Sequence, residues 1–378
     1  MSTVAARPPV PPQRLRALRA VAALLALGVV LGGAELALRL RPPPKLPLPP
    51  HYDPSQPGVE WVEVPGGGRA PVYRAGQSTF HCYDRTVAGA RTWDRESNAP
   101  DGTPVGCVLY RTSERGFRDA DAVARETSPA DRVTVAVVGD SFTFGEGVRE
   151  SERTTERLAA ALEERAPGRF TVSNRGIQGL NLELALGVYR ARIRAEHPAV
   201  LVYAFVPNDA QPFGETIHDE TFLRAVPWRL PSEGLGRWCQ LCELVGRRVG
   251  AMRVSADTIA HVRESFSGPS GDRSDAVLTA LARETAADGT RLVVLEFPMT
   301  PGMAGDPARY RFGFVRDHLA ALANGLAVPL VDLYPDVASW PRQRLWVHPT
   351  DPHPSPELHA LAAIQLVEPV LAAAPPPP

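Results

Sequence analysis

The sequence predicts an α/β domain with a central parallel β-sheet that helices cover on both faces. From residue 131 onward, short apolar runs rich in β-branched residues alternate with helical stretches, which is the pattern of successive strand–helix units. The chain has 378 residues and 44% hydrophobic content, enough for one sizeable domain with extensions. Strands are expected at 132–138, 169–174, 199–206, 290–297 and 327–333, and helices near 151–165, 181–196, 274–287, 310–325 and 355–373.

Two segments precede or interrupt this pattern. Residues 51–130 are rich in Gly, Pro, Tyr and Trp with short β-like runs, so we expect an irregular, β-rich extension that packs on the main domain. The main domain itself should span 131–375. Within it, about eighty residues separate the third and fourth strands, which predicts an insertion at 210–289.

The N-terminus has the features of an export and membrane-anchoring segment. Arg14, Arg16 and Arg19 precede an apolar run from Ala20 to Leu38 that Glu35 interrupts. As a membrane span, this run is about nineteen residues long and places Glu35 near the interface. As a signal peptide, it has a small-x-small cleavage site, GGA. We expect an uncleaved anchor.

Both interpretations export the main domain. We expect residues 1–19 in the cytoplasm, 20–40 in the inner (cytoplasmic) membrane as a single-pass anchor, and 41–50 as a proline-rich tether. The rest of the chain would then lie in the periplasm or outside the cell. A buried helix of a cytosolic protein is the alternative.

Four cysteines fit an oxidising compartment. Cys82 and Cys107 lie in the extension, whereas Cys239 and Cys242 form a C-x-x-C motif in an Arg-rich amphipathic stretch, not at the head of a helix in a βαβ unit. Pairing within each of these two local pairs is the most economical of the three possible connectivities. We therefore expect two disulfides, with a redox or zinc site as the alternative.

The most informative motif is GDSFTFGEGV at 139–148, which follows the first expected strand directly. A strand that ends in Gly-Asp-Ser presents a hydroxyl at its carboxyl end, where ligands bind in an open parallel sheet. Three later motifs each follow another expected strand: NRGIQG at 174–179, VPND at 206–209 and DPHP at 351–354. We expect the four motifs to meet at one edge of the sheet.

These motifs supply the parts of a nucleophilic acyl-transfer site. Serine is a poor nucleophile at neutral pH, so Ser141 needs a base, and His353 lies in a late loop before the last expected helix. Asp351 would accept the other ring N–H and fix the tautomer. His348, in HPTDPH, is a rival base.

In order and content the four motifs resemble the SGNH superfamily, also called GDSL esterases and lipases, over about 240 residues. The segment TSERGFRD at 112–119 resembles the lead-in of bacterial membrane-anchored members. The resemblance implies a flavodoxin-like three-layer sandwich, the SGNH hydrolase fold, and a covalent acyl-serine intermediate. It also favours His353 over His348, because His353 directly precedes the last helix as in the family.

The family pattern implies three donors for the oxyanion of the tetrahedral intermediate: the backbone N–H of Ser141, the backbone N–H of Gly179 and the side-chain amide of Asn208. Two departures concern this pattern. Val206 stands where the family usually has glycine, which bears on the backbone at Asn208, and the last motif has Asp-x-His in place of Asp-x-x-His, which bears on Asp351. As structural alternatives, Gly179 and Asn208 would only form turns.

The sequence gives little support to several other classes of function. No G-x-S-x-G elbow occurs, which argues against an α/β-hydrolase. A net charge of −1 gives no electrostatic case for nucleic acid as a partner. His348, Asp351 and His353 lack a further dispersed ligand at metal-site spacing, so we expect no metal and no other cofactor.

Together these features predict a membrane-tethered serine esterase of SGNH type, with O-acetylated carbohydrate or lipid as the acyl-ester substrate. The main alternative is an O-acetyltransferase that modifies an envelope or secreted polysaccharide together with a membrane acyltransferase. A catalytically inactive carbohydrate-binding module is a second alternative, which the joint presence of Ser141, Asn208, Asp351 and His353 disfavours.

Overall fold

The chain divides into two compact units. One comprises Met1–Leu46 and Glu220–Ala256; the other, Pro47–Asp219 and Asp257–Pro378, contains the extension, the sheet and all the expected site residues. The computed structural model describes residues 12–40, 57–83, 103, 106–119, 132–211, 239–242, 259–300, 303, 305–349 and 351–376.

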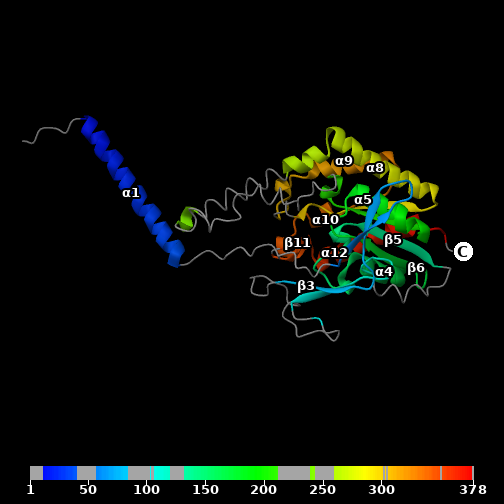
Figure 1. The fold of residues 1–378 in the computed structure, drawn as a ribbon. Coiled ribbons are helices and arrows are strands. Elements are labelled where there is room, and N and C mark those ends of the chain that lie inside the picture. The colour runs from blue at the N-terminus through cyan, green and yellow to red at the C-terminus, as the bar shows by residue number, and fades with distance from the viewer. Residues whose placement is uncertain are drawn as a thin grey trace, which may run out of the picture. The chain divides into compact units, whose positions relative to one another are not determined.

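A five-stranded parallel sheet forms the centre of the second unit, as predicted (Figure 1). Its strands are β5 (Val133–Gly139), β6 (Phe170–Gly176), β7 (Val200–Phe205), β8 (Arg291–Glu296) and β9 (Leu330–Asp332). They lie in the order β6-β5-β7-β8-β9, which is the 2-1-3-4-5 order of flavodoxin-like sheets. In such sheets ligands bind outside the carboxyl ends of the strands where the order reverses, here between β5 and β7.

Helices cover both faces of this sheet. They are α4 (Thr154–Arg165), α5 (Leu182–Val188), α8 (Gly268–Ala287), α9 (Gly313–Gly325) and α12 (Pro356–Ala373). The strand side chains alternate between two cores: in β5, Ala136 and Val138 belong to one and Val135 and Val137 to the other. The first core packs on α5, α8 and α9, and the second on α4 and α12 (Figure 1). The predicted three-layer sandwich is therefore confirmed.

The expected helices are present, with differences at two of them. The helix expected at 181–196 is α5 followed by a π-helical turn, Tyr189–Ile193, and a 3-10 turn, Arg194–Glu196. Helix α8 begins at Gly268, earlier than expected, because the proline that follows is accommodated in a first helical turn. The last part of the expected insertion thus covers the sheet as an ordinary helix.

The extension forms two small antiparallel hairpins, which confirms its β-rich character. In the first, β1 (Val59–Glu63) pairs with β2 (Arg69–Tyr73), and in the second, β3 (Ser78–Cys82) pairs with β4 (Cys107–Arg111). Strand β2 packs closely on α5, since a Cβ on Gly187 would lie 3.2 Å from that of Ala70.

Short elements complete the second unit. They are α3 (Ser141–Phe144), η2 (Glu150–Glu152), η5 (Pro207–Ala210), η8 (Pro307–Arg309), α10 (Tyr334–Val337), α11 (Arg342–Leu345), β10 (Trp346–His348) and β11 (Asp351–Pro354). The last two, β10 and β11, form an antiparallel hairpin before α12.

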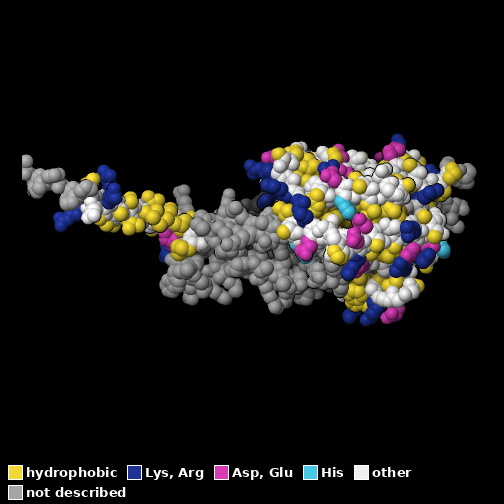
Figure 2. Space-filling view, turned by 90° about the horizontal axis from the view of Figure 1, so that it is seen from above, with side chains coloured by type: hydrophobic (Ala, Val, Ile, Leu, Met, Phe, Trp, Pro, Cys, Tyr) yellow, Lys and Arg dark blue, Asp and Glu magenta, His cyan; other side chains and the backbone are white. Residues whose placement is uncertain are grey.

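In the other unit, α1 (Pro12–Leu40) is long and apolar enough to cross a membrane. Figure 2 shows hydrophobic side chains along most of this helix and basic side chains at its N-terminal end. Glu35, the acidic residue within it, accepts hydrogen bonds from Arg39 at 2.8 Å and from the backbone N–H groups of Gln240 and Leu241 at 2.9 and 2.8 Å. The carboxylate of Glu35 therefore has hydrogen-bond partners although it lies in an apolar helix.

Both predicted disulfides are present. Cys82 is bonded to Cys107 and Cys239 to Cys242, so all four cysteines are paired. The first bridge joins the last residue of β3 to the first residue of β4, which lie opposite each other in the hairpin.

Candidate active site

Ser141 follows β5 by two residues, at the start of α3. The side chain of Asp140 caps this helix by accepting a backbone N–H of its first turn at 2.9 Å. Gly139 is required before it, because a Cβ there would lie 2.4 Å from Oγ1 of Thr143 and 2.7 Å from the carbonyl oxygen of Ala204. The tight turn therefore holds the serine hydroxyl at the carboxyl edge of the sheet.

The second motif supports this turn from the neighbouring strand. Asn174 donates from Nδ2 to the carbonyl oxygen of Thr143 at 2.7 Å and accepts the N–H of Gly176 at 2.9 Å. Gly176 lies against the turn, since a Cβ there would be 2.2 Å from the backbone nitrogen of Phe144. Asn174 and Gly176 thus fix the turn that carries Ser141, a contribution that the sequence alone did not indicate.

The β10–β11 hairpin brings His353 to Ser141. Its Nε2 lies 2.9 Å from Oγ of Ser141, and its Nδ1 lies 2.5 Å from Oδ1 of Asp351. The same carboxylate oxygen accepts the backbone N–H of His353 at 3.0 Å. The three residues therefore form one hydrogen-bonded line, and the short Asp-x-His spacing still lets Asp351 reach the ring.

His348, the rival base, has different neighbours. It is buried, and its ring stacks on that of Tyr83 with centroids 4.5 Å apart and 9° between the planes. The hairpin thus presents His353 to the serine hydroxyl and packs His348 against the extension.

Two side chains that were not predicted from the sequence reach the same line. Tyr83, directly after β3, donates from Oη to Oδ2 of Asp351 at 2.6 Å. Glu146 has its Oε2 3.4 Å from Nε2 of His353. The only signal for Glu146 was its place in the GDSFTFGEGV motif, and no pattern in the extension distinguished Tyr83.

The charges around this line favour a protonated histidine in the resting site. Burial alone would lower the pKa of His353, but the carboxylates of Asp351 and Glu146 outweigh burial and raise this pKa well above its usual range. Burial alone would raise the pKa of Asp351, but His353 and the Tyr83 hydrogen bond hold it well below its usual range. Asp351 is therefore ionised, as an orienting carboxylate must be.

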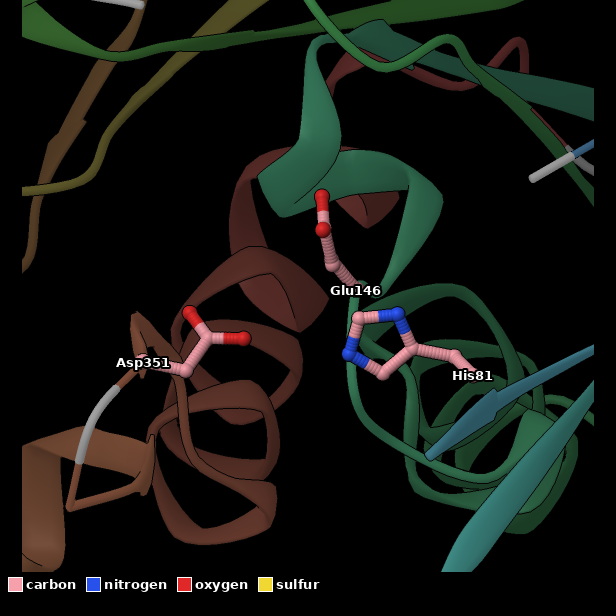
Figure 3. A group of neighbouring side chains, drawn as sticks. All are labelled: His81, Glu146 and Asp351. Carbon is pink, nitrogen blue, oxygen red and sulfur yellow. The ribbon is translucent and has the colours of Figure 1, made fainter. Parts of the chain in front are cut away.

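His81, Glu146 and Asp351 converge from β3, the first motif and β11 (Figure 3). One potential ligand atom from each lies within 4.8 Å of the others, and the three side chains are largely buried. Both oxygens of Asp351 are already hydrogen-bonded, one to His353 and one to Tyr83. Glu146 and Asp351 thus face the His353 ring, whereas His81 packs its ring against those of Tyr83 and Tyr110.

The third motif follows β7 and forms the turn η5. Asp209 fixes this turn by accepting the N–H of Val206 at 3.0 Å and the hydroxyl of Tyr203 at 2.8 Å, and burial raises its pKa well above the usual range. Val206 has φ −123° and ψ 146°, which any residue adopts. Its replacement of the family's glycine therefore does not strain the backbone at Asn208, which is partly exposed.

Gly179 lies in the loop after β6. Its φ is +74°, a left-handed conformation that favours glycine, and the N–H of the preceding Gln178 donates to Oη of Tyr73 at 2.8 Å. Ser141, Gly179 and Asn208 thus follow three adjacent strands at their carboxyl ends. This edge is where ligands bind in such a sheet.

A flavodoxin-like sandwich with a serine, a histidine and a carboxylate hydrogen-bonded at its carboxyl edge defines a hydrolase of the serine esterase class. The family model described as "GDSL-like Lipase/Acylhydrolase family" matches residues 137–361. The chain belongs to this family of hydrolases that act on ester bonds.

Several solved structures are similar at low sequence identity. The structure titled "Crystal Structure of TesA" is 18% identical, with 64% of this chain and 99% of that chain covered and a TM-score of 0.40. The acetyl xylan esterase AlAXEase is 13% identical over 63% and 100% of the two chains, with a TM-score of 0.41. A mutant of the acetylxylan esterase Axe2 from Geobacillus stearothermophilus is 13% identical over 65% and 96%, with a TM-score of 0.40. No curated protein matches the sequence.

Proposed function

We propose that the protein is an exported, membrane-anchored esterase that removes acyl groups, above all acetyl, from carbohydrate through a covalent acyl-Ser141 intermediate. The observation that carries this proposal is the unbroken line from Oγ of Ser141 through the His353 ring to Asp351, with separations of 2.9 and 2.5 Å. Such a line activates a serine hydroxyl for attack on a carbonyl carbon. An acylated lipid is the second substrate class.

The proposed reaction proceeds in two halves. In the first, neutral His353 accepts the Ser141 proton while Oγ bonds to the carbonyl carbon; the tetrahedral intermediate collapses, and His353 gives the proton to the departing alcohol. In the second, His353 accepts a proton from water as its oxygen attacks the acyl carbon, and the proton returns to Oγ as the carboxylic acid leaves. The N–H groups of Ser141 and Gly179 and the amide of Asn208 would hold the oxyanion in both halves.

The proposed location follows from α1. Its apolar length suits a single-pass anchor in the inner membrane, and the basic residues 14, 16 and 19 at its start suit a cytoplasmic N-terminus. The hydrolase domain would then lie in the periplasm or outside the cell, linked through the proline-rich segment 41–50. Two disulfides are consistent with an oxidising compartment.

A fluorophosphonate probe followed by an ester screen tests the proposal. The full chain in detergent should react covalently with the probe and Ser141→Ala should not. Release of acetate from acetylated oligosaccharides should be faster than release of fatty acid from long-chain lipid esters. Release from lipid esters alone would change the substrate class. Failure of the probe to label the wild-type protein would refute the serine mechanism.

A further inference from the structure

We propose that the extension completes the active site: Tyr83 is a positioning residue for Asp351, and the Cys82–Cys107 disulfide holds Tyr83 in place, so that turnover depends on this disulfide. The proposal rests on the esterase function above and assigns a role to a segment outside the matched residues 137–361.

Tyr83 fixes the side of Asp351 that faces away from the histidine. Oδ1 of Asp351 is bonded to His353, and Oδ2 accepts the Tyr83 hydroxyl at 2.6 Å. Asp351 is 4% exposed, so water does not solvate its Oδ2, and this oxygen needs a hydrogen-bond donor from the protein. Without that donor, the carboxylate would be held through Oδ1 alone, by the ring and the backbone N–H of His353, and its orientation toward the imidazole would be less restricted.

Packing holds the Tyr83 ring in a closed slot. The ring stacks on His348 and meets the edge of His81, with centroids 4.5 and 4.7 Å away. On its other side lies Gly147, where a Cβ would be 2.0 Å from Oη of Tyr83. The hydroxyl therefore sits between the first motif and the β10–β11 hairpin, and any side chain at position 147 would displace it.

The disulfide lies directly beside this tyrosine. Cys82 precedes Tyr83 and is bonded to Cys107, and the N–H of Tyr83 donates to the carbonyl oxygen of Gly106 at 3.0 Å. Among the described residues β3 and β4 pair with each other alone; Val108 and Tyr110 anchor the middle of this ribbon in the core, but no third strand holds its end at Cys82 and Cys107. The bridge spans 25 residues of sequence and thus closes the end of the ribbon that carries Tyr83.

The extension also holds the first motif at a second place. Arg118, after β4, is fully buried and donates to the carbonyl oxygens of Gly145 at 2.6 Å and Val148 at 2.9 Å. These residues flank Glu146 and Gly147, so the loop against Tyr83 is itself fixed from the extension. The extension therefore supplies both Tyr83 and the Arg118 hydrogen bonds that hold the loop packed against Tyr83.

The test compares Tyr83→Phe with Tyr189→Phe. Tyr189 makes a hydrogen bond of the same kind, from Oη to Oδ2 of Asp288 at 2.7 Å, so its loss controls for general effects of removing a buried tyrosine hydroxyl. Tyr83→Phe should lower kcat about tenfold with little change in KM, the order expected for one hydrogen bond to a charged group. Tyr189→Phe should retain wild-type kcat. Wild-type kcat in Tyr83→Phe would overturn the proposal.

A double-mutant cycle tests the disulfide. The pair Cys82→Ser and Cys107→Ser should lose about as much kcat as Tyr83→Phe, and combining all three changes should cost little more, because both act through one contact. The matched pair Cys239→Ser and Cys242→Ser should keep wild-type kcat. Fully additive losses, or no loss in the first pair, would refute the coupling.

Two measurements keep the test decisive where a serine variant misfolds or esterase activity is absent. Dithiothreitol, which reduces the disulfide to two thiols while forming its own cyclic disulfide, should lower kcat in folded wild-type protein but not in the Cys82→Ser, Cys107→Ser pair. The downfield proton resonance of the His353 Nδ1–H should shift in Tyr83→Phe and not in Tyr189→Phe. An unmoved resonance would count against Tyr83 whatever the enzyme hydrolyses, whereas a shifted resonance without any ester turnover would count against the function alone.

Discussion

Oε2 of Glu146 lies 3.4 Å from Nε2 of His353, the same ring nitrogen that contacts the Ser141 hydroxyl. A carboxylate at this position stabilises the imidazolium, and together with Asp351 it raises the pKa of His353. As the proposed base, His353 is active only when neutral, so the rate should rise toward alkaline pH until His353 has lost its proton.

Glu146→Gln should move the acidic limb of the pH profile to lower pH. The substitution keeps the shape of the side chain and removes its charge. The pKa of His353 should therefore fall, and His353 should become neutral at a lower pH. The profile of kcat/KM for an aryl acetate, measured from acid to alkaline pH, reports this shift. A limb that stays in place would mean that Glu146 does not act on the base.

His353→Ala and His348→Ala should differ in kind. Loss of His353 removes the base and should lower kcat by about 10³-fold or more. Loss of His348 removes the ring that stacks on Tyr83, so it should lower the melting temperature and reduce kcat by about tenfold at most. Steady-state kinetics with thermal denaturation of both variants distinguishes them, and the opposite ranking of kcat would exchange their roles.

Asn208→Ala should lower kcat about 100-fold, or about 3 kcal/mol, with KM nearly unchanged, because an oxyanion donor acts mainly in the transition state. The turn should survive, since Asp209 and not Asn208 holds it through Val206 and Tyr203. Initial rates over a range of ester concentrations separate the two constants. An effect on KM alone would make Asn208 a substrate-binding residue.

The sequence was sufficient for the sheet and for the residues at its edge. Motifs that directly follow buried parallel strands must meet at one edge, which is why Ser141, Gly179 and Asn208 could be located from strand positions. Tyr83 could not be, because it comes from a ribbon with no periodic pattern and reaches Asp351 only through tertiary packing. The choice of His353 over His348 came from the resemblance to the family, because residue type alone does not reveal how the β10–β11 hairpin turns.

The burial of Glu296, the last residue of β8, was also not predicted from the sequence. It is 1% exposed, and neither carboxyl oxygen has a hydrogen-bond partner within the described part of the chain. Burial and the nearby Asp332 raise its pKa to about 8 from 4.5. Between pH 4.5 and about 8 the folded state therefore keeps a proton on Glu296 that the unfolded state has released. The free energy of unfolding accordingly decreases as the pH rises through this interval.

Glu296→Gln should flatten that dependence. The amide resembles the protonated carboxyl in shape and cannot ionise, so the melting temperature of the variant should exceed that of the wild type at pH 8 and match it more closely near pH 4. Thermal denaturation across this interval measures the difference. Parallel curves for the two proteins would show that Glu296 does not titrate there.

The central claim is a covalent acyl group on Ser141, and rapid quenching followed by peptide mass spectrometry measures it directly. Acid quenching during turnover of an aryl acetate should reveal acetyl on the peptide that contains Ser141, and Ser141→Ala should carry none and lose more than nine-tenths of kcat. Acetyl on a different residue, or a Ser141→Ala variant that keeps more than about a tenth of wild-type kcat, would contradict the assignment.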